Sequence, residues 1–200
     1  MNLNILNSDQ KDFLPLLKLF NRSFYLVGGT AIALQIGHRE SIDFDLFTRK
    51  EPLNYDLISD KIKKSNNVVQ TVFTRKSFCY TLVINNVQFT FYSYLYDVPL
   101  NESFENYIKM PDLLTLAAMK AFALGKRAKW KDYVDLYFIL TKYHTLKEIS
   151  LKAKEIFKGE FNDKNFRISL SYFEDVDYTE KVNYKNNSEV EDALIKKHFK

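Results

Sequence analysis

The segment over residues 24–47 most constrains the fold, because it predicts a strand, a tight turn, a short helix and a second strand. An apolar run over residues 24–27 ends abruptly in Gly28-Gly29, and a short helical pattern runs from Thr30 to Gly37. Residues 41–47 alternate polar and apolar side chains, the period of a strand with one buried face. A glycine turn before a helix lets backbone N–H groups approach phosphate oxygens.

Two carboxylates lie on the second of these strands. Asp43 and Asp45 are two residues apart, so both point to the same face. Such a pair ionises reluctantly unless a cation lies between the carboxylates. Mg²⁺ takes oxygen ligands, usually one or two carboxylates together with substrate phosphates. The pattern therefore predicts a magnesium site at Asp43 and Asp45, with Gly28, Gly29 and the hydroxyl of Thr30 cradling the phosphates of a nucleotide.

The first 100 residues predict a small mixed β-sheet with helices packed on it. Beyond the segment above, we expect helices over 10–20 and 53–64 and strands over 68–74, 78–84 and 87–94. Asn85-Asn86 lies between the last two strands, and asparagine tolerates the positive φ of a tight hairpin turn.

The second half, over residues 101–200, predicts a mostly helical lobe. Pro111-Asp112 favours a helix start with Pro111 in the first turn, and that helix should end near Gly125. A second helix is expected over 130–142, and two capping-box patterns predict two more. Those patterns are Thr145-x-x-Glu148 and Ser188-x-x-Glu191. The sequence thus predicts an α+β protein whose lobes, 1–100 and 101–200, meet near residues 98–110 and pack as one unit.

A block of charged residues follows the start of the helical lobe. Its members are Lys120, Arg127, Lys131, Asp132 and Asp135. The three basic residues would share one face of an unbroken helix, although Gly125 can break that register. Asp135 lies four residues after Lys131, which predicts a local ion pair. The alternative interpretation is a solvated helix surface with local ion pairs.

Two segments of this sequence resemble conserved blocks of a known enzyme superfamily. The run Val27-Gly28-Gly29, then 13 residues, then Asp43-x-Asp45 resembles the nucleotidyltransferase signature of the DNA polymerase β superfamily. The longer form Arg39-x-Ser41-x-Asp43-x-Asp45 resembles the AbiEii/AbiGii toxin branch. Residues 112–137 are similar to the second conserved block of that branch.

The resemblance implies a nucleotidyltransferase that moves a nucleoside monophosphate from a nucleoside triphosphate to an acceptor hydroxyl. Mg²⁺ would be the cofactor, Lys120 would neutralise triphosphate charge, and Asp132 or Asp135 would orient basic groups or activate the acceptor. Nucleotide-binding roles extend to Arg39, Ser41, Arg127 and Lys131. The implied biology is the toxin of a bacterial toxin–antitoxin or phage-defence system, with an antitoxin protein as partner and an RNA acceptor such as a tRNA 3′ end.

One departure from the superfamily pattern concerns its third carboxylate. The aligned strand position is Thr90, which cannot act as a carboxylate base. Either Asp132 or Asp135 has taken over that work, or the chain is a nucleotide- or RNA-binding module with impaired catalysis.

Composition leaves these interpretations open and excludes others. The net charge of +4 permits a nucleic-acid partner without arguing for one. A single cysteine, Cys79, fits a reducing compartment, and no apolar stretch approaches the roughly 18 residues of a membrane span. We therefore expect a cytoplasmic protein with no membrane partner. The acidic run at the end of residues 165–180 is either a solvated loop or a partner-binding edge.

Overall fold

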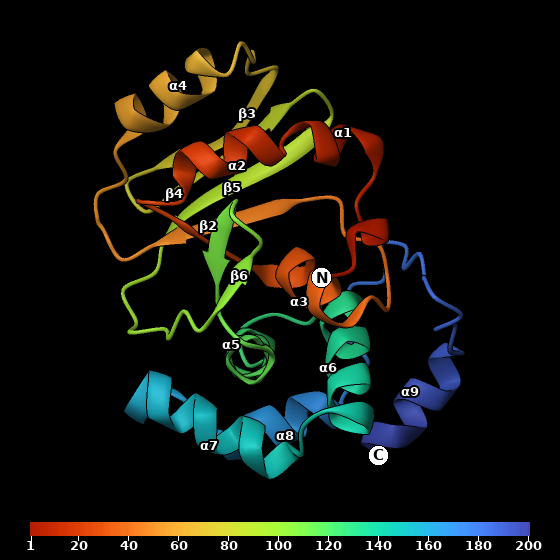
Figure 1. The fold of residues 1–200 in the computed structure, drawn as a ribbon. Coiled ribbons are helices and arrows are strands. Elements are labelled where there is room, and N and C mark those ends of the chain that lie inside the picture. The colour runs from red at the N-terminus through yellow and green to blue at the C-terminus, as the bar shows by residue number, and fades with distance from the viewer.

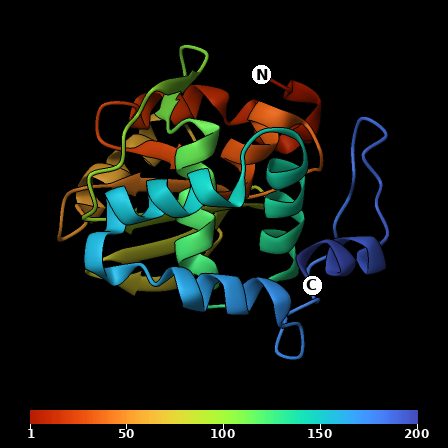
Figure 2. The ribbon, with the colours of Figure 1, turned by 90° about the horizontal axis from the view of Figure 1, so that it is seen from below.

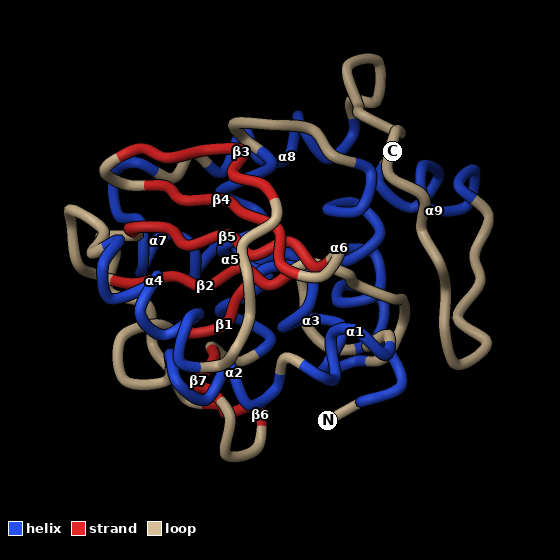
Figure 3. Tube along the Cα trace, turned by 90° about the horizontal axis from the view of Figure 1, so that it is seen from above, coloured by secondary structure: helices blue, strands red, loops and turns tan.

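The N-terminal half is built on a five-stranded mixed sheet in this computed structural model, which describes all 200 residues. The strand order is β1-β2-β5-β4-β3, with β2 and β5 parallel and the other neighbours antiparallel. The bounds are β1 (Tyr25–Val27), β2 (Phe44–Thr48), β3 (Thr71–Lys76), β4 (Cys79–Ile84) and β5 (Val87–Ser93). Figure 3 shows these strands side by side.

Helices lie on both sides of this sheet (Figure 1). One side carries α1 (Ser8–Asp12), α2 (Leu14–Phe20) and α4 (Tyr55–Lys64), and the other carries α5 (Leu113–Leu124), α6 (Trp130–Lys142), α7 (Leu146–Phe157) and α8 (Asp163–Ser171). The remaining elements are α3 (Gly28–Ile36), which follows β1, the hairpin β6 (Glu102–Phe104) and β7 (Ile108–Met110), α9 (Asp192–Phe199) and two 3₁₀ turns, Leu3–Ile5 and Lys158–Glu160. Figure 2 shows α7 and α8 running across α5.

Strict alternation along β2 and β5 gives the sheet two different faces. Phe44, Leu46, Phe89 and Phe91 are fully buried, with Phe89 packed edge-on against Phe13 at a ring-centroid distance of 5.3 Å. The intervening side chains are half-buried and point toward the helical lobe. The core face therefore holds the fold together, and the opposite face is free to carry chemistry.

A single hydrophobic cluster of 50 buried residues runs from Ile5 to Ile195 and includes both halves of the chain. The hairpin β6–β7, which the sequence did not suggest, lies within the segment where the lobes were expected to meet, and β7 packs beside β1. None of the helices is long and apolar enough to cross a bilayer.

Several expected elements are confirmed and others need correction. Helix 130–142, the Thr145–Glu148 capping box and the positive φ values of Asn85 and Asn86 are confirmed. The helix expected over 10–20 is two helices, because Pro15 in the first turn of α2 lacks the N–H that a continuous helix needs. The strand expected over 41–47 begins at Phe44, and the one expected over 68–74 covers Thr71–Lys76.

Two predicted helix starts are also corrected. Asp112 is the N-cap of α5 and accepts a hydrogen bond from the Thr115 amide, so Pro111 precedes the helix. The Ser188-x-x-Glu191 capping box is wrong, because α9 begins at Asp192 with Glu191 as its N-cap. Ser188 instead donates its amide to the Lys185 carbonyl in a turn.

Candidate active site

The glycine turn and the carboxylate strand are in direct contact. Gly28 follows β1 immediately and opens α3 with a φ of +73°. A Cβ at Gly28 would lie 2.1 Å from Oδ2 of Asp45, so no other residue fits there. Val27 also pairs with Asp45 across β1 and β2. The start of α3 therefore lies against the carboxylate, as the sequence pattern predicted.

Asp43 and Asp45 have no partner within the chain. Both are half-buried beside a cavity, and neither carboxylate takes part in a hydrogen bond or ion pair. Burial, and then the charge of Glu180, raises the pKa of Asp43. Burial, and then the charge of Asp43, raises the pKa of Asp45 to about 6. The charges of Lys131 and Lys129 near Asp43, and of Arg127 near Asp45, offset these shifts only in part, and no hydrogen bond or ion pair compensates the two carboxylates directly.

This donor set fits a hard divalent cation. Carboxylate oxygens without protein partners are the ligands that Mg²⁺ uses together with waters and substrate phosphates. The chain contains no cluster of three or more His, Cys, Asp or Glu side chains that could hold a metal without other ligands. An ion at Asp43 and Asp45 would therefore need further oxygen ligands, which phosphates and waters supply.

Behind this edge lies a buried charge network centred on Asp135. Arg39 donates to both of its oxygens, from Nε at 2.7 Å and Nη2 at 2.8 Å, and Lys120 Nζ lies 2.8 Å from Oδ2. His38 Nε2 lies 2.7 Å from Oδ1. Burial alone would raise the pKa of Asp135, but the charges of Arg39 and Lys120 outweigh it and hold that pKa well below its usual range.

The network corrects the predicted ion pair between Lys131 and Asp135. Asp135 is completely buried and faces Arg39 and Lys120, so its oxygens are unavailable to Lys131. Lys131 Nζ instead lies 3.0 Å from Oε2 of Glu180. Asp135 also lies outside the cavity lining, which favours the orienting role and leaves it no access to an acceptor.

Thr30 also differs from its predicted role as a phosphate contact. Its side chain is buried outside the cavity lining, where the hydroxyl donates to the backbone carbonyl of Asp43 and lies 2.9 Å from Ser41 Oγ. Thr30 therefore ties α3 to the segment that enters β2. The packing around Gly29 is also close, because an added Cβ would lie 2.6 Å from Arg39 Nη2.

Most of the predicted site residues line a cavity of about 480 Å³ between the sheet and α5. The predicted residues that line it are Gly28, Gly29, Arg39, Ser41, Asp43, Asp45, Lys120, Arg127, Lys131 and Asp132. α5 ends at Leu124 with Gly125 as its C-cap, so the basic residues do not share one helix face as they would on an unbroken helix. They converge because the α5–α6 connection lines the cavity through Lys126, Arg127 and Lys129.

Asp132 and Thr90 are the two residues relevant to the third carboxylate of the superfamily pattern, which this chain lacks. Asp132 is buried at the cavity lining, and its Oδ1 lies 2.5 Å from Lys120 Nζ. Its Oδ2 lies 3.5 Å from Arg127 Nε and accepts no hydrogen bond. Thr90 pairs in register with Asp45 on the neighbouring strand and lines the same cavity. The strand position beside the carboxylate pair therefore carries a hydroxyl.

Sequence reasoning missed other residues of the cavity wall. Glu180, the last residue of the acidic run, lines the cavity. Its carboxylate oxygens lie 2.5 Å from Lys129 Nζ and 3.0 Å from Lys131 Nζ. The hydrogen bond from Lys129, followed by that from Lys131, lowers the pKa of Glu180 to about 2. No local pattern pointed to Glu180, whereas strand alternation could have placed Phe47 and Tyr92 on the face of Asp45.

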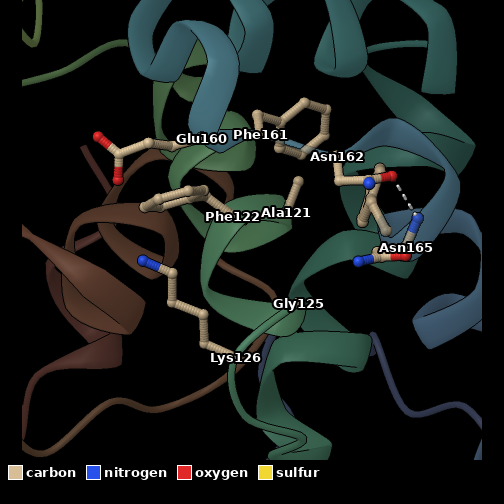
Figure 4. A pocket seen from close by; sticks show the side chains of 9 residues that line it. Ala121, Phe122, Gly125, Lys126, Glu160, Phe161, Asn162 and Asn165 are labelled. Carbon is tan, nitrogen blue, oxygen red and sulfur yellow. Dashed lines mark hydrogen bonds between the residues drawn. The ribbon is translucent and has the colours of Figure 1, made fainter.

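A second cavity, of about 70 Å³, lies between α5 and the start of α8 (Figure 4). Asn162 and Asn165 there form the N-cap of α8, with the Asn165 amide 3.0 Å from Asn162 Oδ1. This space is small for a nucleotide, and Glu160 is the one carboxylate in its lining. The larger cavity is therefore the candidate active site.

Comparisons with known proteins identify relatives of this chain. Residues 16–200 match the family model described as nucleotidyl transferase AbiEii toxin, Type IV TA system. An uncharacterized protein of Aquifex aeolicus (strain VF5) is 35% identical over 161 residues, which cover 76% of this chain and 74% of that protein.

Two solved structures show the same fold at low sequence identity. The nucleotidyltransferase toxin MenT4 of Mycobacterium tuberculosis H37Rv has a TM-score of 0.61 and 12% identity, covering 96% of this chain and 80% of its own. JHP933 of Helicobacter pylori has a TM-score of 0.55 and 18% identity, covering 75% of each chain. Because the family model spans nearly the whole sequence, the chain belongs to the AbiEii family of nucleotidyltransferase toxins.

Proposed function

We propose that the chain transfers a nucleoside monophosphate from a nucleoside triphosphate to an acceptor hydroxyl and releases pyrophosphate. The contact between Gly28 and Asp45, inside a cavity whose other wall carries Lys120, is the observation that supports this most. Phosphate groups would lie between the N–H groups at the start of α3 and the basic wall, where both attract negative charge.

Asp43 and Asp45 would hold Mg²⁺, which when bound stabilises charge on the reacting phosphate. Lys120 would add to this stabilisation. Its Nζ is held by Asp132 and Asp135, so the positive charge is already in place before a substrate arrives. Such preorganised charge is what lowers the energy of a transition state.

The acceptor hydroxyl must lose a proton, and Asp132 is the acid best placed to take it. It lines the cavity, and its Oδ2, 3.5 Å from Arg127 Nε, accepts no hydrogen bond, whereas Asp135 lies outside the cavity lining with both oxygens bound by basic side chains. A general base contributes about 10²–10⁴-fold in rate, so Asp132→Asn should lose that factor in incorporation and still bind Mg-NTP. Full activity in this variant would exclude Asp132 as the base.

The biological setting proposed is a bacterial toxin that acts in the cytoplasm. An antitoxin protein would be its partner and an RNA, such as a tRNA 3′ end, its acceptor. The family description supports the toxin, and the cavity wall of Lys120, Lys126, Arg127, Lys129 and Lys131 is suited to phosphate-rich ligands. A role in phage defence is part of the same proposal.

The experiment is incubation of pure protein with each labelled NTP, Mg²⁺ and total RNA. We expect label from one or more NTPs to enter a defined RNA species, with pyrophosphate released. Incorporation that is absent with every NTP, together with absent NTP binding, would contradict the proposal.

A second candidate function follows from Thr90. With a hydroxyl beside Asp45 in place of an acid, the same cavity would bind a nucleotide or RNA with impaired transfer. Wild-type protein that binds Mg-NTP and never incorporates it, across a broad screen of acceptors, would favour this alternative.

A further inference from the structure

Along strands β2 and β5, the side chains that line the candidate active site change from polar to aromatic. Phe47 and Tyr92 are register partners one two-residue step beyond Asp45 and Thr90, and their rings are 5.2 Å apart. Tyr94 continues the row, with its ring 5.1 Å from that of Phe47. These three half-buried rings line the cavity and are called the aromatic shelf below.

The aromatic shelf lies on the cavity face of the sheet, with Phe47 and Tyr94 partly buried against the hydrophobic cluster. The alternate residues of the same strands, Phe44, Leu46, Phe89 and Phe91, are completely buried on the opposite face. Across the cavity, α5 presents the apolar side chains of Leu116, Met119 and Phe122. Phe122 is fixed by stacking on Phe157, with ring centroids 4.0 Å apart. The far end of the cavity is thus a slot with an aromatic floor and an apolar roof.

The distance between the carboxylate pair and the aromatic shelf is compatible with the distance between the phosphates and the base of a nucleotide. A two-residue step along a strand covers about 6.6 Å, so the shelf starts about that far from the carboxylate pair. Asp43 lies on the opposite side of Asp45 from the shelf, and the ion-paired residues Lys129, Lys131 and Glu180 line the same cavity. If the phosphates bind beside the carboxylates and lysines, the ribose would span the distance from the carboxylates to the shelf.

We infer that the aromatic shelf binds a nucleobase by stacking, an inference that rests on the proposed function. The base belongs either to the NTP or to the terminal nucleotide of the acceptor. Both present a planar aromatic ring, and stacking on aromatic side chains tolerates every base. Lys126 Nζ, 3.9 Å from the centre of the Phe122 ring, places a cation at the rim of the slot.

The test compares Tyr92→Leu, which removes the ring, with Tyr92→Phe, which keeps it. Calorimetry measures the Kd of ATP, GTP, CTP and UTP with Mg²⁺, and that of inorganic tripolyphosphate with Mg²⁺. If the base belongs to the NTP, Tyr92→Leu should weaken binding of at least one NTP by about 5- to 150-fold, the range for one stacked base. Tripolyphosphate binding should not change, and Tyr92→Phe should bind NTP like the wild type.

If the base belongs to the acceptor, NTP binding is unchanged in Tyr92→Leu and the KM for single-stranded RNA rises by a similar factor. Unchanged NTP binding and unchanged KM would overturn the inference. Tyr94→Leu repeats the test should Tyr92→Leu melt below the wild type. A wild type that binds neither Mg-NTP nor tripolyphosphate would instead contradict the proposed function, and the inference with it.

Discussion

Asp135 and the pair Asp43 and Asp45 lie close together in the structure but have opposite surroundings. Asp135 is completely buried and each of its oxygens is bound by a basic side chain. Asp43 and Asp45 are half-buried at the edge of a cavity, and neither carboxylate takes part in a hydrogen bond or ion pair. Burial costs a carboxylate stability unless partners are supplied, so an uncompensated pair indicates a site that is completed by a ligand.

The largest expected effect comes from breaking the uncompensated pair. Asp43→Ala removes a metal ligand worth several kcal/mol, which corresponds to a loss of at least about 10³-fold in nucleotide incorporation. Its melting temperature should equal or exceed that of the wild type, because a charge that repels Asp45 is gone. Asp60→Ala, on the exposed surface of α4, is the control that should change neither quantity.

Breaking the compensated group should instead cost stability. Asp135→Asn leaves the buried Arg39 without its ion-pair partner and Lys120 with Asp132 alone, which should lower the free energy of unfolding by about 3–5 kcal/mol. Urea denaturation measures this. Asp163→Asn, which loses a partly exposed pair with Arg167, should cost less than about 1 kcal/mol. Equal losses in the two variants would show that the buried network does not stabilise the fold.

The same network predicts a dependence of stability on pH. An Asp135 carboxylate whose folded pKa lies below the unfolded value of about 3.9 contributes fully above that pH and is lost as the pH falls. The free energy of unfolding of the wild type should therefore fall more steeply below about pH 4 than that of Asp135→Asn. Urea denaturation from pH 7 to pH 3 compares the slopes, and parallel slopes would contradict the account.

The smallest effect is expected at Glu180, whose carboxylate is partly exposed and binds Lys129 and Lys131. Glu180→Gln would free both lysines for phosphate and remove a negative charge near Asp43. Partly exposed pairs of this kind are worth up to about 1 kcal/mol, so NTP affinity should rise by no more than about fivefold. Weaker NTP binding would mean that Glu180 positions the lysines for the substrate.

The parts of the site that were predictable from sequence share a local cause. The glycine turn and the alternation around Asp43 and Asp45 encode strand, turn and facing direction within a few residues. α6 was predictable because its apolar residues keep helical spacing between Trp130 and Lys142. The five-strand order was not, since pairing of distant strands leaves no mark in a single sequence.

The parts that were missed depend on contacts between distant segments. Spacing on α6 suggested that Asp135 pairs with Lys131, but tertiary packing turns Asp135 toward Arg39 from another element. The sequence predicted that Thr30 contacts phosphate, but in the structure its hydroxyl donates a hydrogen bond to the backbone carbonyl of Asp43. Glu180 reaches the cavity from a segment with no regular pattern, so only the folded chain brings it to Lys129.

The most direct test of the contrast between the two groups is a thermal shift with Mg²⁺ and NTP. A ligand at 100 times its Kd stabilises the folded state by about 2.7 kcal/mol. We expect Mg²⁺ and NTP together to raise the melting temperature of the wild type, and we expect Asp43→Ala to abolish this rise while melting normally without ligand. An equal rise in Asp43→Ala, or a rise in the wild type that persists without Mg²⁺, would contradict the assignment of Asp43 and Asp45 as the cation site.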